Sequence, residues 1–330
     1  MQQRIALNSF IKDEFCDLGA RDPAFSGILT PASAINDPPT GLTAQFTEVA
    51  GEYATRYANS AYFKSLIERG LGLVGFTDQV RDVLDFGAGA GDNSTFPCLE
   101  LYPHAQVLAT DLSPQLLVLL RDEAHRRGLS SQVAPLCLDA MNDVFLPECF
   151  DLVIGSAILH HLINPSAALE AAYKALRPGG VALFFEPFEA GNAMLCMLFE
   201  RIMAEANLRN DPLPPLTLHF FHLFTMDVHR RIGRDKSADY FREVDDKWLF
   251  GRPYFYEVGQ KLGYSKVSID PIEKGNHQMQ GRSDALLRLA AGSSFSQLPD
   301  WAQHHIQTAD RLLVESIPDL ISEAIVALMK

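Results

Sequence analysis

The sequence has few cysteines, and they do not form a pattern that suits a zinc site or a disulfide framework. The five cysteines are an odd number, lie far apart in a chain of 330 residues, and include no CxxC pair. They are Cys16, Cys98, Cys137, Cys149 and Cys196. We therefore predict no bound metal, and a reducing, cytoplasmic setting.

Basic residues and long apolar runs are also scarce. The chain has 28 Lys and Arg against 41 Asp and Glu, a formal net charge of −13, which opposes general binding to phosphate backbones. No stretch approaches the roughly 18 apolar residues of a membrane span, and the first residues lack the apolar segment of a signal peptide. We expect no nucleic-acid partner and no membrane insertion.

Hydrophobic residues make up 47% of the chain, enough for a large core. From residue 80 onward, short apolar runs alternate with helix-like segments, which is typical of a parallel sheet covered on both faces. The predicted strands of this part are Val80–Phe86, Gln106–Thr110, Val133–Leu138, Phe150–Gly155 and Val181–Phe185. Capping signals agree, since Ser113 and Pro114 can begin a helix that Gly128 ends. The pattern predicts a doubly wound α/β fold.

After Glu186 the alternation lapses, and the chain has the character of an inserted segment. A helix is expected over Met194–Ala206, but Pro214 and Pro215 argue against a regular helix in the aromatic-rich run that follows. We expect a loop and a lid element there, because long inserted segments often cover active sites.

Periodicity and turn residues predict the remaining elements. They are a helix over Pro253–Leu262, a strand over Lys266–Ile269, helical structure over Arg282–Ser316 and a strand, or alternatively a helix tail, over Ala324–Met329. The first forty residues, with Pro31, Pro38 and Pro39, are expected to form an arm against the core.

A glycine-rich turn ends the first predicted strand, in the segment Asp85–Asp92. Gly87, Gly89 and Gly91 let the backbone turn sharply and approach a ligand without Cβ atoms in the way. A dinucleotide site needs glycine where Asp92 stands, because the pyrophosphate binds there at a helix N-terminus. The negative charge of Asp92 therefore favours a cofactor without phosphate groups.

Two acids end the next two predicted strands. Asp111 stands where a carboxylate accepts hydrogen bonds from ribose hydroxyls in nucleoside sites, and Asp139 can reach the exocyclic amine of a base. Each can instead be an acid that merely ends a strand and caps a helix. The order of glycine turn, first acid and second acid along one sheet edge indicates a nucleoside cofactor.

Five segments resemble motifs of the class I S-adenosylmethionine-dependent methyltransferases: VLDFGAGAGDNS, VLATDLSPQLL, CLDAMN, FDLVIGSAILHHL and LRPGGVALFFEPF. The resemblance covers roughly residues 45–187 and implies S-adenosylmethionine as the cofactor. It also implies a seven-stranded sheet whose last strand is antiparallel. The cofactor-binding residues that it implies are Tyr57, Asp85, Gly87, Ala88, Gly89, Gly91, Asp111, Leu112, Asp139, Ala140 and Ser156.

Read through this family, each part of the cofactor has its own contacts. Asp85 and the glycine turn would surround the methionine part, Asp111 would hold the ribose, and Asp139 with Ala140 would contact adenine. Ser156 would lie near the cofactor's amino group.

The full prediction is an α/β fold with a doubly wound, mostly parallel seven-stranded sheet and helical lid insertions. Four parts are expected: an N-terminal arm with a cofactor-covering helix (1–60), a cofactor-binding core (61–187), an inserted lid or substrate segment (188–250), and the completion of the sheet with a helical insertion (251–330).

His160, His161 and Glu186 are the candidate catalytic residues, because each stands near a strand end and can exchange a proton with a substrate. The histidines can instead pack against the cofactor, and Glu186 can instead anchor the inserted segment by hydrogen bonds. Tyr53 and Tyr57, four residues apart on a predicted helix, either close over the cofactor carboxylate or face the core.

Other polar residues have simpler interpretations. His219, His222 and His229 suggest a metal site, but no carboxylate stands at a familiar ligand spacing, so aromatic packing in the lid is favoured. Asp245 and Asp246 either face the substrate or are solvated loop charges, and the second interpretation is favoured.

The predicted function is transfer of the methyl group of S-adenosylmethionine to a small organic acceptor through an oxygen, nitrogen or carbon nucleophile. Close alignment of nucleophile and methyl supplies much of such catalysis, so a conspicuous catalytic motif is not required. The acceptor pocket is expected between the N-terminal arm, the residues Phe220–Phe224 and the helical segment from Arg282, a mostly apolar set.

Two alternatives stay open at this point: an enzyme that binds S-adenosylmethionine for other chemistry, and a noncatalytic scaffold of the same fold. The oligomeric state is also open, and a homodimer is compatible with the sequence.

Overall fold

The computed structural model describes residues 5–35, 42–142, 144–233, 235–236, 238–273, 275, 277–314, 317 and 319–330. Pro38, Pro39 and Ser316, named above, lie outside these ranges. Within the ranges, no helix combines the length and the apolar character that crossing a membrane requires.

In the described chain, nine strands form one sheet. In spatial order they are β1 (Phe15–Asp17), β2 (Leu29–Pro31), β5 (Val133–Cys137), β4 (Gln106–Asp111), β3 (Asp82–Phe86), β6 (Phe150–Ser156), β7 (Leu176–Pro187), β9 (Glu323–Met329) and β8 (Lys266–Pro271). β5, β4, β3, β6 and β7 run parallel, and β9 runs antiparallel between β7 and β8. The chain therefore builds outward from β3 in both directions, which confirms the doubly wound α/β sheet and its antiparallel last strand.

The sheet has two strands more than the seven predicted. β1 and β2 pair antiparallel, and β2 joins the edge of the sheet where Leu29 pairs parallel with Leu136. Each of the two strands is three residues long, too short to show an alternating pattern in the sequence. The N-terminal residues therefore extend the sheet.

The α-helices of the described chain are α1 (Ala50–Tyr57), α2 (Ser60–Val74), α3 (Thr95–Leu101), α4 (Pro114–Arg126), α5 (Pro165–Ala175), α6 (Glu189–Arg209), α7 (Pro215–Arg231), α8 (Arg252–Leu262), α9 (Gln278–Ala291) and α10 (Asp300–Ala309), and a π-helical turn over Asp310–Val314 follows α10. Short 3-10 helices lie at Leu7–Ser9, Leu18–Ala20, Pro23–Phe25, Ala32–Ala34, Ala44–Phe46, Leu159–His161, Asp239–Arg242 and Phe295–Gln297.

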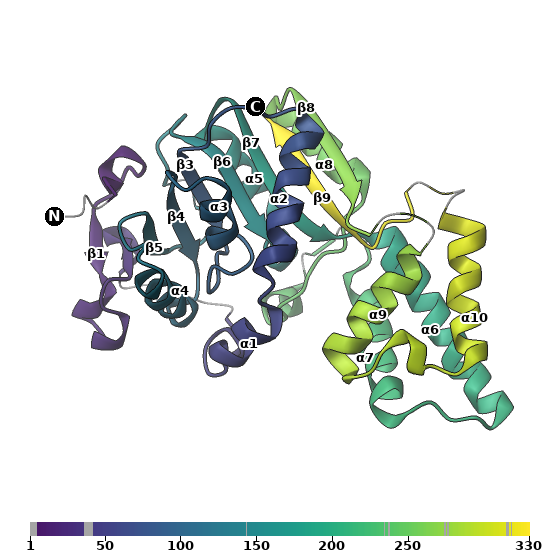
Figure 1. The fold of residues 1–330 in the computed structure, drawn as a ribbon. Coiled ribbons are helices and arrows are strands. Elements are labelled where there is room, and N and C mark those ends of the chain that lie inside the picture. Colours follow the sequence, from purple (N-terminus) through teal and green to yellow (C-terminus); the bar gives the residue numbers. More distant parts are fainter. Residues whose placement is uncertain are drawn as a thin grey trace.

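Helices cover both faces of the sheet (Figure 1). On β3, Val83 shares a core with side chains of α2, α3 and α4, whereas Leu84 and Phe86 share a core with side chains of α5 and α8. Alternate residues of a strand point to opposite faces, so one short apolar run contributes to two cores.

A helical bundle of α6, α7, α9 and α10 stands beside the sheet (Figure 1). Its core is rich in aromatic rings, and Phe199 of α6 stacks on Phe221 of α7 with the ring centroids 4.1 Å apart. Residues 188–250 supply two of these helices and residues 251–330 the other two, so the bundle joins two of the predicted parts.

The prediction that prolines prevent a regular helix in the aromatic run is wrong. Pro214 immediately precedes α7, and Pro215 occupies its first position, where the amide hydrogen that proline lacks has no helical partner anyway. The two residues therefore mark where a helix of 17 residues begins.

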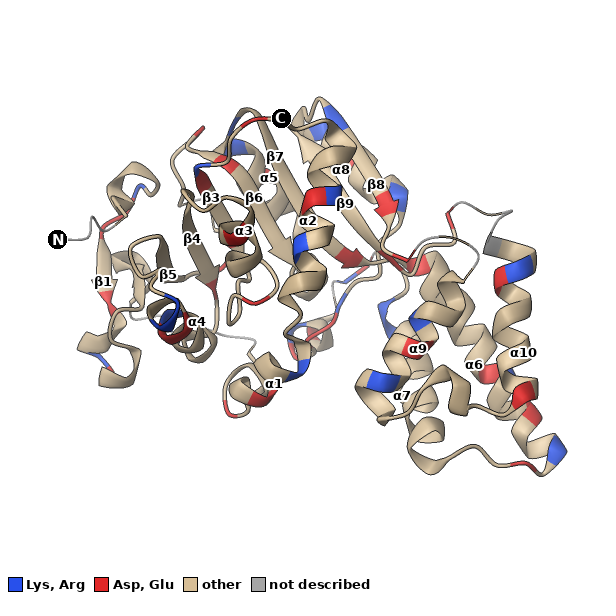
Figure 2. Ribbon diagram, viewed as in Figure 1, with Lys and Arg blue, Asp and Glu red and all other residues tan. Residues whose placement is uncertain are grey.

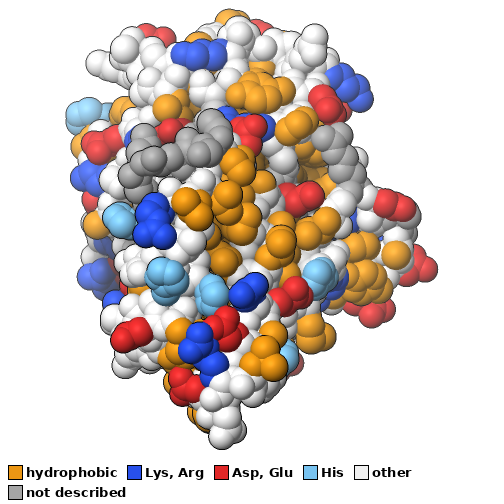
Figure 3. All heavy atoms as spheres, turned by 90° about the vertical axis from the view of Figure 1, so that its right-hand side faces the viewer, with side chains coloured by type: hydrophobic (Ala, Val, Ile, Leu, Met, Phe, Trp, Pro, Cys, Tyr) orange, Lys and Arg blue, Asp and Glu red, His pale blue; other side chains and the backbone are white. Residues whose placement is uncertain are grey.

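The surface of the bundle is mixed in character. Lys and Arg are interspersed with Asp and Glu on its helices (Figure 2), and hydrophobic side chains lie between charged ones and histidines on its outward side (Figure 3). Exposed apolar residues of α6 and α7 include Met197, Leu216, Leu223 and Met226.

We predict that Gly70 is a stability determinant because α2 packs against side chains of the sheet there without room for a Cβ. A Cβ on Gly70 would lie 2.5 Å from Cδ1 of Leu183 and 2.9 Å from Cγ2 of Ile325, whereas one on Gly72 would meet nothing within 4 Å. Both Gly→Ala changes gain about 1 kcal/mol of helix propensity, but Gly70→Ala also overpacks the core, at a cost of about 1–3 kcal/mol.

Urea unfolding should therefore place the free energy of unfolding of Gly70→Ala about 1–3 kcal/mol below that of the matched control Gly72→Ala. Equal values for the two variants would show that the side chains of the sheet accommodate the added methyl group with no loss of free energy of unfolding.

Candidate functional site

A pocket lies at the carboxyl edge of the parallel strands, beside the point where the strand order reverses between β3 and β6. It contains about 800 Å³ of space, part of which is open to solvent. Its walls come mainly from the turns that follow β3, β4, β5 and β6. This is where doubly wound sheets bind their ligands.

The glycine turn forms one wall of the pocket. Gly87 and Gly89 have φ angles of +63° and +55°, a region that glycine adopts without strain. A Cβ on Gly87 would lie 2.6 Å from Cδ1 of Ile158, so this residue must also be small. A Cβ on Gly89 would meet nothing within 4 Å, because the turn opens there onto the pocket. Bare backbone is therefore exposed where a ligand would approach.

Asp85 is buried behind the turn and is not part of the pocket walls. Its Oδ2 accepts hydrogen bonds from the hydroxyls of Ser94 and Thr95 at 2.6 and 2.5 Å, and its Oδ1 has no partner among the described residues. Burial raises the pKa of Asp85 to about 7, although the two hydroxyls act to lower it. Asp85 was predicted to surround the methionine part of the cofactor together with the glycine turn, and here its carboxylate secures the start of α3 under that turn.

The Asp111 carboxylate is fixed at the end of β4 by backbone amides. The N–H of Gly89 donates to Oδ2 at 2.9 Å, and the N–H of Ser113 donates to Oδ1 at 2.8 Å. Each oxygen keeps acceptor capacity, so the carboxylate can accept two further hydrogen bonds from neighbouring hydroxyls in the pocket. Burial raises the pKa of Asp111, while the backbone amides act to lower it. The glycine turn and this acid form one hydrogen-bonded unit.

The turns after β5 and β6 add polar groups to the walls. Asp139 and Ala140 line the pocket, and Oδ1 of Asp139 also accepts from the N–H of Met141 at 2.9 Å, so this acid stabilises its own turn as well. Ser156 ends β6, and its Oγ is buried with no partner among the described residues. An unpaired buried hydroxyl in a pocket wall is available to a ligand.

A roof over the pocket is formed by residues 42–57. Phe46 and Tyr53 line the pocket from this side, with ring centroids 5.0 Å apart. Burial raises the pKa of Tyr53, and Tyr57 and Asp111 add to the shift. Tyr53 therefore faces the site as a neutral phenol.

Side-chain hydrogen bonds hold the roof in place. Thr43 Oγ1 and Gln45 Nε2 donate to Oδ2 of Asp245 at 2.9 and 2.7 Å, and Ser113 Oγ donates to the carbonyl of Phe46 at 2.5 Å. Asp245 itself lines the pocket, and its Oδ1 is buried with no partner among the described residues. Hydrogen bonds therefore connect the roof both to the start of α4 and to Asp245, in the segment that precedes Lys247.

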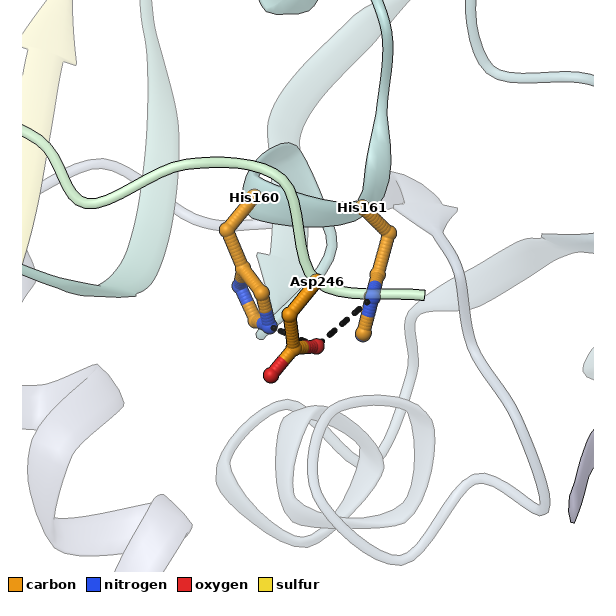
Figure 4. A group of neighbouring side chains, drawn as sticks. All are labelled: His160, His161 and Asp246. Atoms are coloured by element: carbon orange, nitrogen blue, oxygen red, sulfur yellow. Dashed lines mark ion pairs between the residues drawn. The ribbon is translucent and has the colours of Figure 1, made fainter. Parts of the chain in front are cut away.

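The turn after β6 presents two histidines on either side of one carboxylate (Figure 4). Nε2 of His160 lies 3.4 Å from Oδ1 of Asp246, and Nδ1 of His161 lies 3.2 Å from the same oxygen. His161 lines the pocket, whereas His160 is buried behind it with Nδ1 2.7 Å from Oε2 of Glu186.

Glu186 is buried at the end of β7 and fixes the turn that carries the histidines. Its Oε1 accepts from the N–H groups of Ile158 and Leu159 at 3.1 and 2.8 Å, and its Oε2 accepts from the N–H of His160 at 3.2 Å. The prediction that Glu186 and His160 act on a substrate is not met by these positions. Both belong to the hydrogen-bonded turn that carries His161, and the contacts of Glu186 described here go to this turn rather than to the inserted segment.

Asp246 is partly buried and is not the solvated loop charge that the sequence suggested. Nη1 of Arg231 lies 3.0 Å from its Oδ2, and the same guanidinium donates to the carbonyl of Trp248 at 2.9 Å. The arginine stands at the end of α7 and the histidines follow β6. Because these partners of Asp246 lie far from it in the sequence, the residues around Asp246 do not indicate that its charge is partly buried.

The shared charges give the two histidines opposite protonation states. Burial acts to lower the pKa of His160, but Glu186 and Asp246 outweigh it and raise the pKa to about 9. Burial, together with the charge of His160, lowers the pKa of His161 to about 3. Burial acts to raise the pKa of Asp246, but His160 and Arg231 hold it well below its usual range. At neutral pH an imidazolium at His160 therefore stands beside a neutral His161.

Hydrogen bonding selects one tautomer of His161. Its Nδ1 lies 3.1 Å from the carbonyl oxygen of Asp245 and 3.2 Å from Oδ1 of Asp246, and both of these atoms are acceptors. Nδ1 therefore carries the proton, and Nε2 keeps its lone pair.

His160, His161 and Asp246 have ligand atoms within 4.8 Å of one another, a spacing compatible with a metal ion. The carboxylates here already have cationic partners, because the His160 imidazolium lies between Glu186 and Asp246 and the Arg231 guanidinium pairs with Asp246. We interpret the cluster as a network that fixes protons.

Most of the predicted cofactor-binding residues lie at two adjoining spaces. Gly87, Gly89, Asp111, Leu112, Asp139, Ala140 and Ser156 line the main pocket. Tyr57, Ala88 and Gly91 line a smaller space above the glycine turn, to which Gly87, Gly89 and Ser156 also contribute. The structure thus brings together all the predicted cofactor-binding residues except Asp85 along one continuous edge.

The predicted acceptor walls are partly wrong. Phe220–Phe224 and the segment from Arg282 line neither space, because Phe220 and Phe221 fill the core of the bundle. The charged run Asp245–Lys247, between apolar residues in VDDKWLF, is the signal that sequence reasoning undervalued.

The three histidines of the aromatic run do not pack as lid residues. His219, His222 and His229 are exposed on α7, whose buried residues include Phe220 and Phe221. His229 pairs with Glu200 of α6, its Nε2 lying 2.9 Å from Oε1.

Residues 84–182 match a family model described as a methyltransferase domain. An uncharacterized protein of Synechococcus sp. is 30% identical over 120 residues, 36% of this chain and 28% of that protein. The ubiquinone/menaquinone biosynthesis C-methyltransferase UbiE of Dinoroseobacter shibae is 32% identical over 104 residues, 32% of this chain and 41% of that protein. The chain thus spans less than half the length of these relatives.

Two solved structures are among those similar to this chain. The phosphoethanolamine N-methyltransferase 2 of Haemonchus contortus, in complex with S-adenosyl-L-methionine, gives a TM-score of 0.49 at 16% identity, over 87% of this chain and 58% of that one. The geranyl diphosphate C-methyltransferase of Streptomyces coelicolor A3(2) gives 0.48 at 10% identity, over 83% and 85%.

The opposite protonation of the two histidines is directly measurable. In NMR titrations of histidine-labelled protein, we expect His160 to lose its proton near pH 9, and His161 to stay neutral with the proton on Nδ1 from about pH 5 upward. His160→Gln and His161→Gln assign the two signals. Titration of the His161 ring between about pH 6 and 7, the range of an ordinary imidazole, would contradict the assigned network.

Proposed function

We propose that this protein is an S-adenosylmethionine-dependent methyltransferase that acts on a small organic acceptor. Its residues 84–182 belong to the class I S-adenosylmethionine-dependent methyltransferases. The proposal rests on one observation above all. Gly89 exposes bare backbone to the pocket, and its N–H orients the Asp111 carboxylate beside that opening.

The residues present fit such a cofactor. Asp111 would accept hydrogen bonds from the two ribose hydroxyls, because each of its oxygens is already aimed by one backbone N–H and has capacity left. Ser156 Oγ, buried and unpaired in the described chain, would meet the amino group of the methionine part. Asp139 and Ala140 would face the base.

The charge of the site also suits this cofactor. Asp111, Asp139 and Asp245 line the main pocket, with Lys247 as a cation among them, and Asp92 lines the smaller space. A mostly acidic lining attracts a sulfonium and repels a pyrophosphate.

When bound, S-adenosylmethionine supplies a methyl group on a positively charged sulfur that a nucleophile attacks in line. The protein's part is to hold the acceptor close and aligned, which the roof of Phe46 and Tyr53 supports by covering the pocket. Leu42, Ile158 and Leu162 give the same pocket apolar walls, which suit a small organic molecule.

His161 is the residue we assign to the acceptor's proton. With Nδ1 occupied by Asp245 and Asp246, its Nε2 can accept a hydrogen bond from an O–H or N–H of the acceptor. A pKa near 3 makes His161 a weak base, but the acceptor group becomes far more acidic as it gains the methyl, so a weak base suffices late in the transfer. Its low pKa also keeps Nε2 available at every physiological pH.

We further propose a cytoplasmic setting and a role in small-molecule metabolism. All five cysteines are free, and four of them are buried, as expected of a protein that folds without disulfides.

Transfer itself is tested with S-adenosylmethionine labelled in its methyl group. Incubated with the protein and small-molecule extracts, the label should appear in a product. Label that stays on the cofactor despite tight binding would favour other chemistry on the same cofactor, and absence of binding would favour a noncatalytic scaffold.

Asp111→Ala should weaken S-adenosylmethionine binding by about 1–3 kcal/mol, because it removes the charged acceptor for the ribose hydroxyls. Calorimetric titration measures the affinity, and Asp122→Ala, at an exposed carboxylate on α4, is the matched control that should bind as the wild type does. Wild-type affinity in the Asp111→Ala variant would contradict the proposal that Asp111 binds the ribose hydroxyls.

His161→Gln should lower kcat about 100-fold or more with the acceptor found in the labelling experiment, while cofactor affinity stays the same. In the wild type, His161 should contribute no fall in kcat/KM as pH drops from about 8 to 5, because it remains unprotonated above a pKa of about 3. His222→Gln, an exposed change on α7, is the control. An acid limb near pH 6.5 that His161→Gln abolishes would show an ordinary imidazole base instead.

A further inference from the structure

A second cluster of metal-binding side chains lies outside the pocket, between the first two helices of the bundle. Cys196 and Glu200 are four residues apart and share one face of α6, and His229 reaches them from the last turn of α7. Sγ of Cys196 lies 3.7 Å from Nε2 of His229 and 3.9 Å from Oε1 of Glu200. These nitrogen and oxygen atoms are 2.9 Å apart, so the three donor atoms form a compact triangle.

We infer that Cys196, Glu200 and His229 bind a divalent transition-metal ion of the zinc type. Sulfur, nitrogen and oxygen ligands on a tetrahedral zinc ion, at bond lengths of about 2.0–2.3 Å, are separated from one another by about 3.3–3.6 Å. The separations here, 2.9 to 3.9 Å, lie on both sides of that range. Small side-chain rotations therefore bring all three atoms onto one ion.

The kinds of donor select the class of metal. A thiolate beside an imidazole and a carboxylate suits zinc and its tetrahedral relatives, whereas calcium and magnesium take oxygen ligands. The side chains of His229 and Glu200 are 64% and 48% exposed, so an ion can enter from solvent and keep a water as its fourth ligand. Cys196 closes the inner side, packed against Val228 and Leu249.

Simpler explanations cover only part of this arrangement. Packing alone accounts for the burial of Cys196, and a surface ion pair alone accounts for the contact between His229 and Glu200. Neither accounts for three donor atoms of different kinds that converge from two helices.

The binding step exchanges a proton for the ion. The S–H bond of Cys196 breaks, a bond from sulfur to the metal forms, and the proton leaves to the buffer, with no change of oxidation state. Burial, with the nearby Glu200 carboxylate, raises the pKa of Cys196 to about 11 in the metal-free protein, so the proton is present at neutral pH and about one is released per ion.

The site has a structural consequence and does not depend on the proposed methyl transfer. The ion would tie α6 to the last turn of α7, where Arg231 contacts Asp246. Sequence analysis predicted no metal because the three ligands of this site are divided between two helices and form no recognisable spacing.

Cobalt(II) and zinc titrations of the full chain test the inference. One equivalent of Co²⁺ should produce the charge-transfer absorption of a cobalt thiolate, which Zn²⁺ should then displace. Calorimetry of Zn²⁺ binding in buffers of different ionisation enthalpy should count about one proton released per ion. The thiolate absorption separates this cluster from His160, His161 and Asp246, which contain no sulfur.

Variants assign the ligands. Cys196→Ala should abolish the thiolate absorption, and His229→Ala should weaken zinc binding at least about 10-fold. Because His229 is exposed, we expect its replacement to keep the fold. His229→Ala therefore tests whether this cluster binds the ion even where Cys196→Ala is poorly folded. His222→Ala, exposed on the same helix, and Cys16→Ser, at a partly exposed cysteine, should leave both signals unchanged.

Three results would overturn the inference. They are the absence of thiolate absorption at one equivalent of Co²⁺, a zinc affinity of His229→Ala equal to that of the wild type, and loss of the absorption in Cys16→Ser.

Discussion

The hydrogen bond from the N–H of Gly89 to Oδ2 of Asp111 joins the ends of β3 and β4 at the centre of the sheet. Because parallel strands end at one edge, the turns after β5 and β6 open beside the same bond, and Asp139 and Ser156 come to line the same pocket. The roof rests on this edge too, since Ser113, two residues after Asp111, donates to the carbonyl of Phe46. The hydrogen bond between Gly89 and Asp111 thus fixes two strand ends beside which the other polar groups of the pocket lie.

The helical bundle influences this edge through charge. Arg231 at the end of α7 and the imidazolium of His160 both contact Asp246. These two cations offset much of the effect that the negative charge of Asp246 has on His161. A carboxylate alone would raise the pKa of a neighbouring imidazole, but burial and the charged His160 lower the pKa of His161 to about 3. The protonation of a pocket residue therefore depends on a helix that does not line the pocket.

Sequence reasoning succeeded where the relevant contacts are local. The strand before the glycine turn and the placement of Asp111 and Asp139 at one edge follow from short segments whose meaning does not depend on distant partners. The antiparallel last strand was expected from the resemblance to the methyltransferase family. It failed where partners come from far along the chain. The residues around Asp246 in the sequence do not indicate that it pairs with Arg231. β1 and β2 are strands only because they pair with each other and because β2 pairs with the sheet at Leu136. Pro215 shows a third kind of error, in which a correct rule about helix interiors was applied to a helix start.

Two histidine clusters in this chain have similar spacing but different chemistry, and charge accounts for the difference. At His160, His161 and Asp246, the carboxylates of Glu186 and Asp246 are already paired with the His160 imidazolium and the Arg231 guanidinium, so an added cation would have to displace these partners. At Cys196, Glu200 and His229, a carboxylate and a neutral thiol that can lose its proton face one imidazole, so a cation gains both charge and ligands. Geometry alone would rank the two clusters together. The local balance of charge assigns protons to the first and a metal ion to the second.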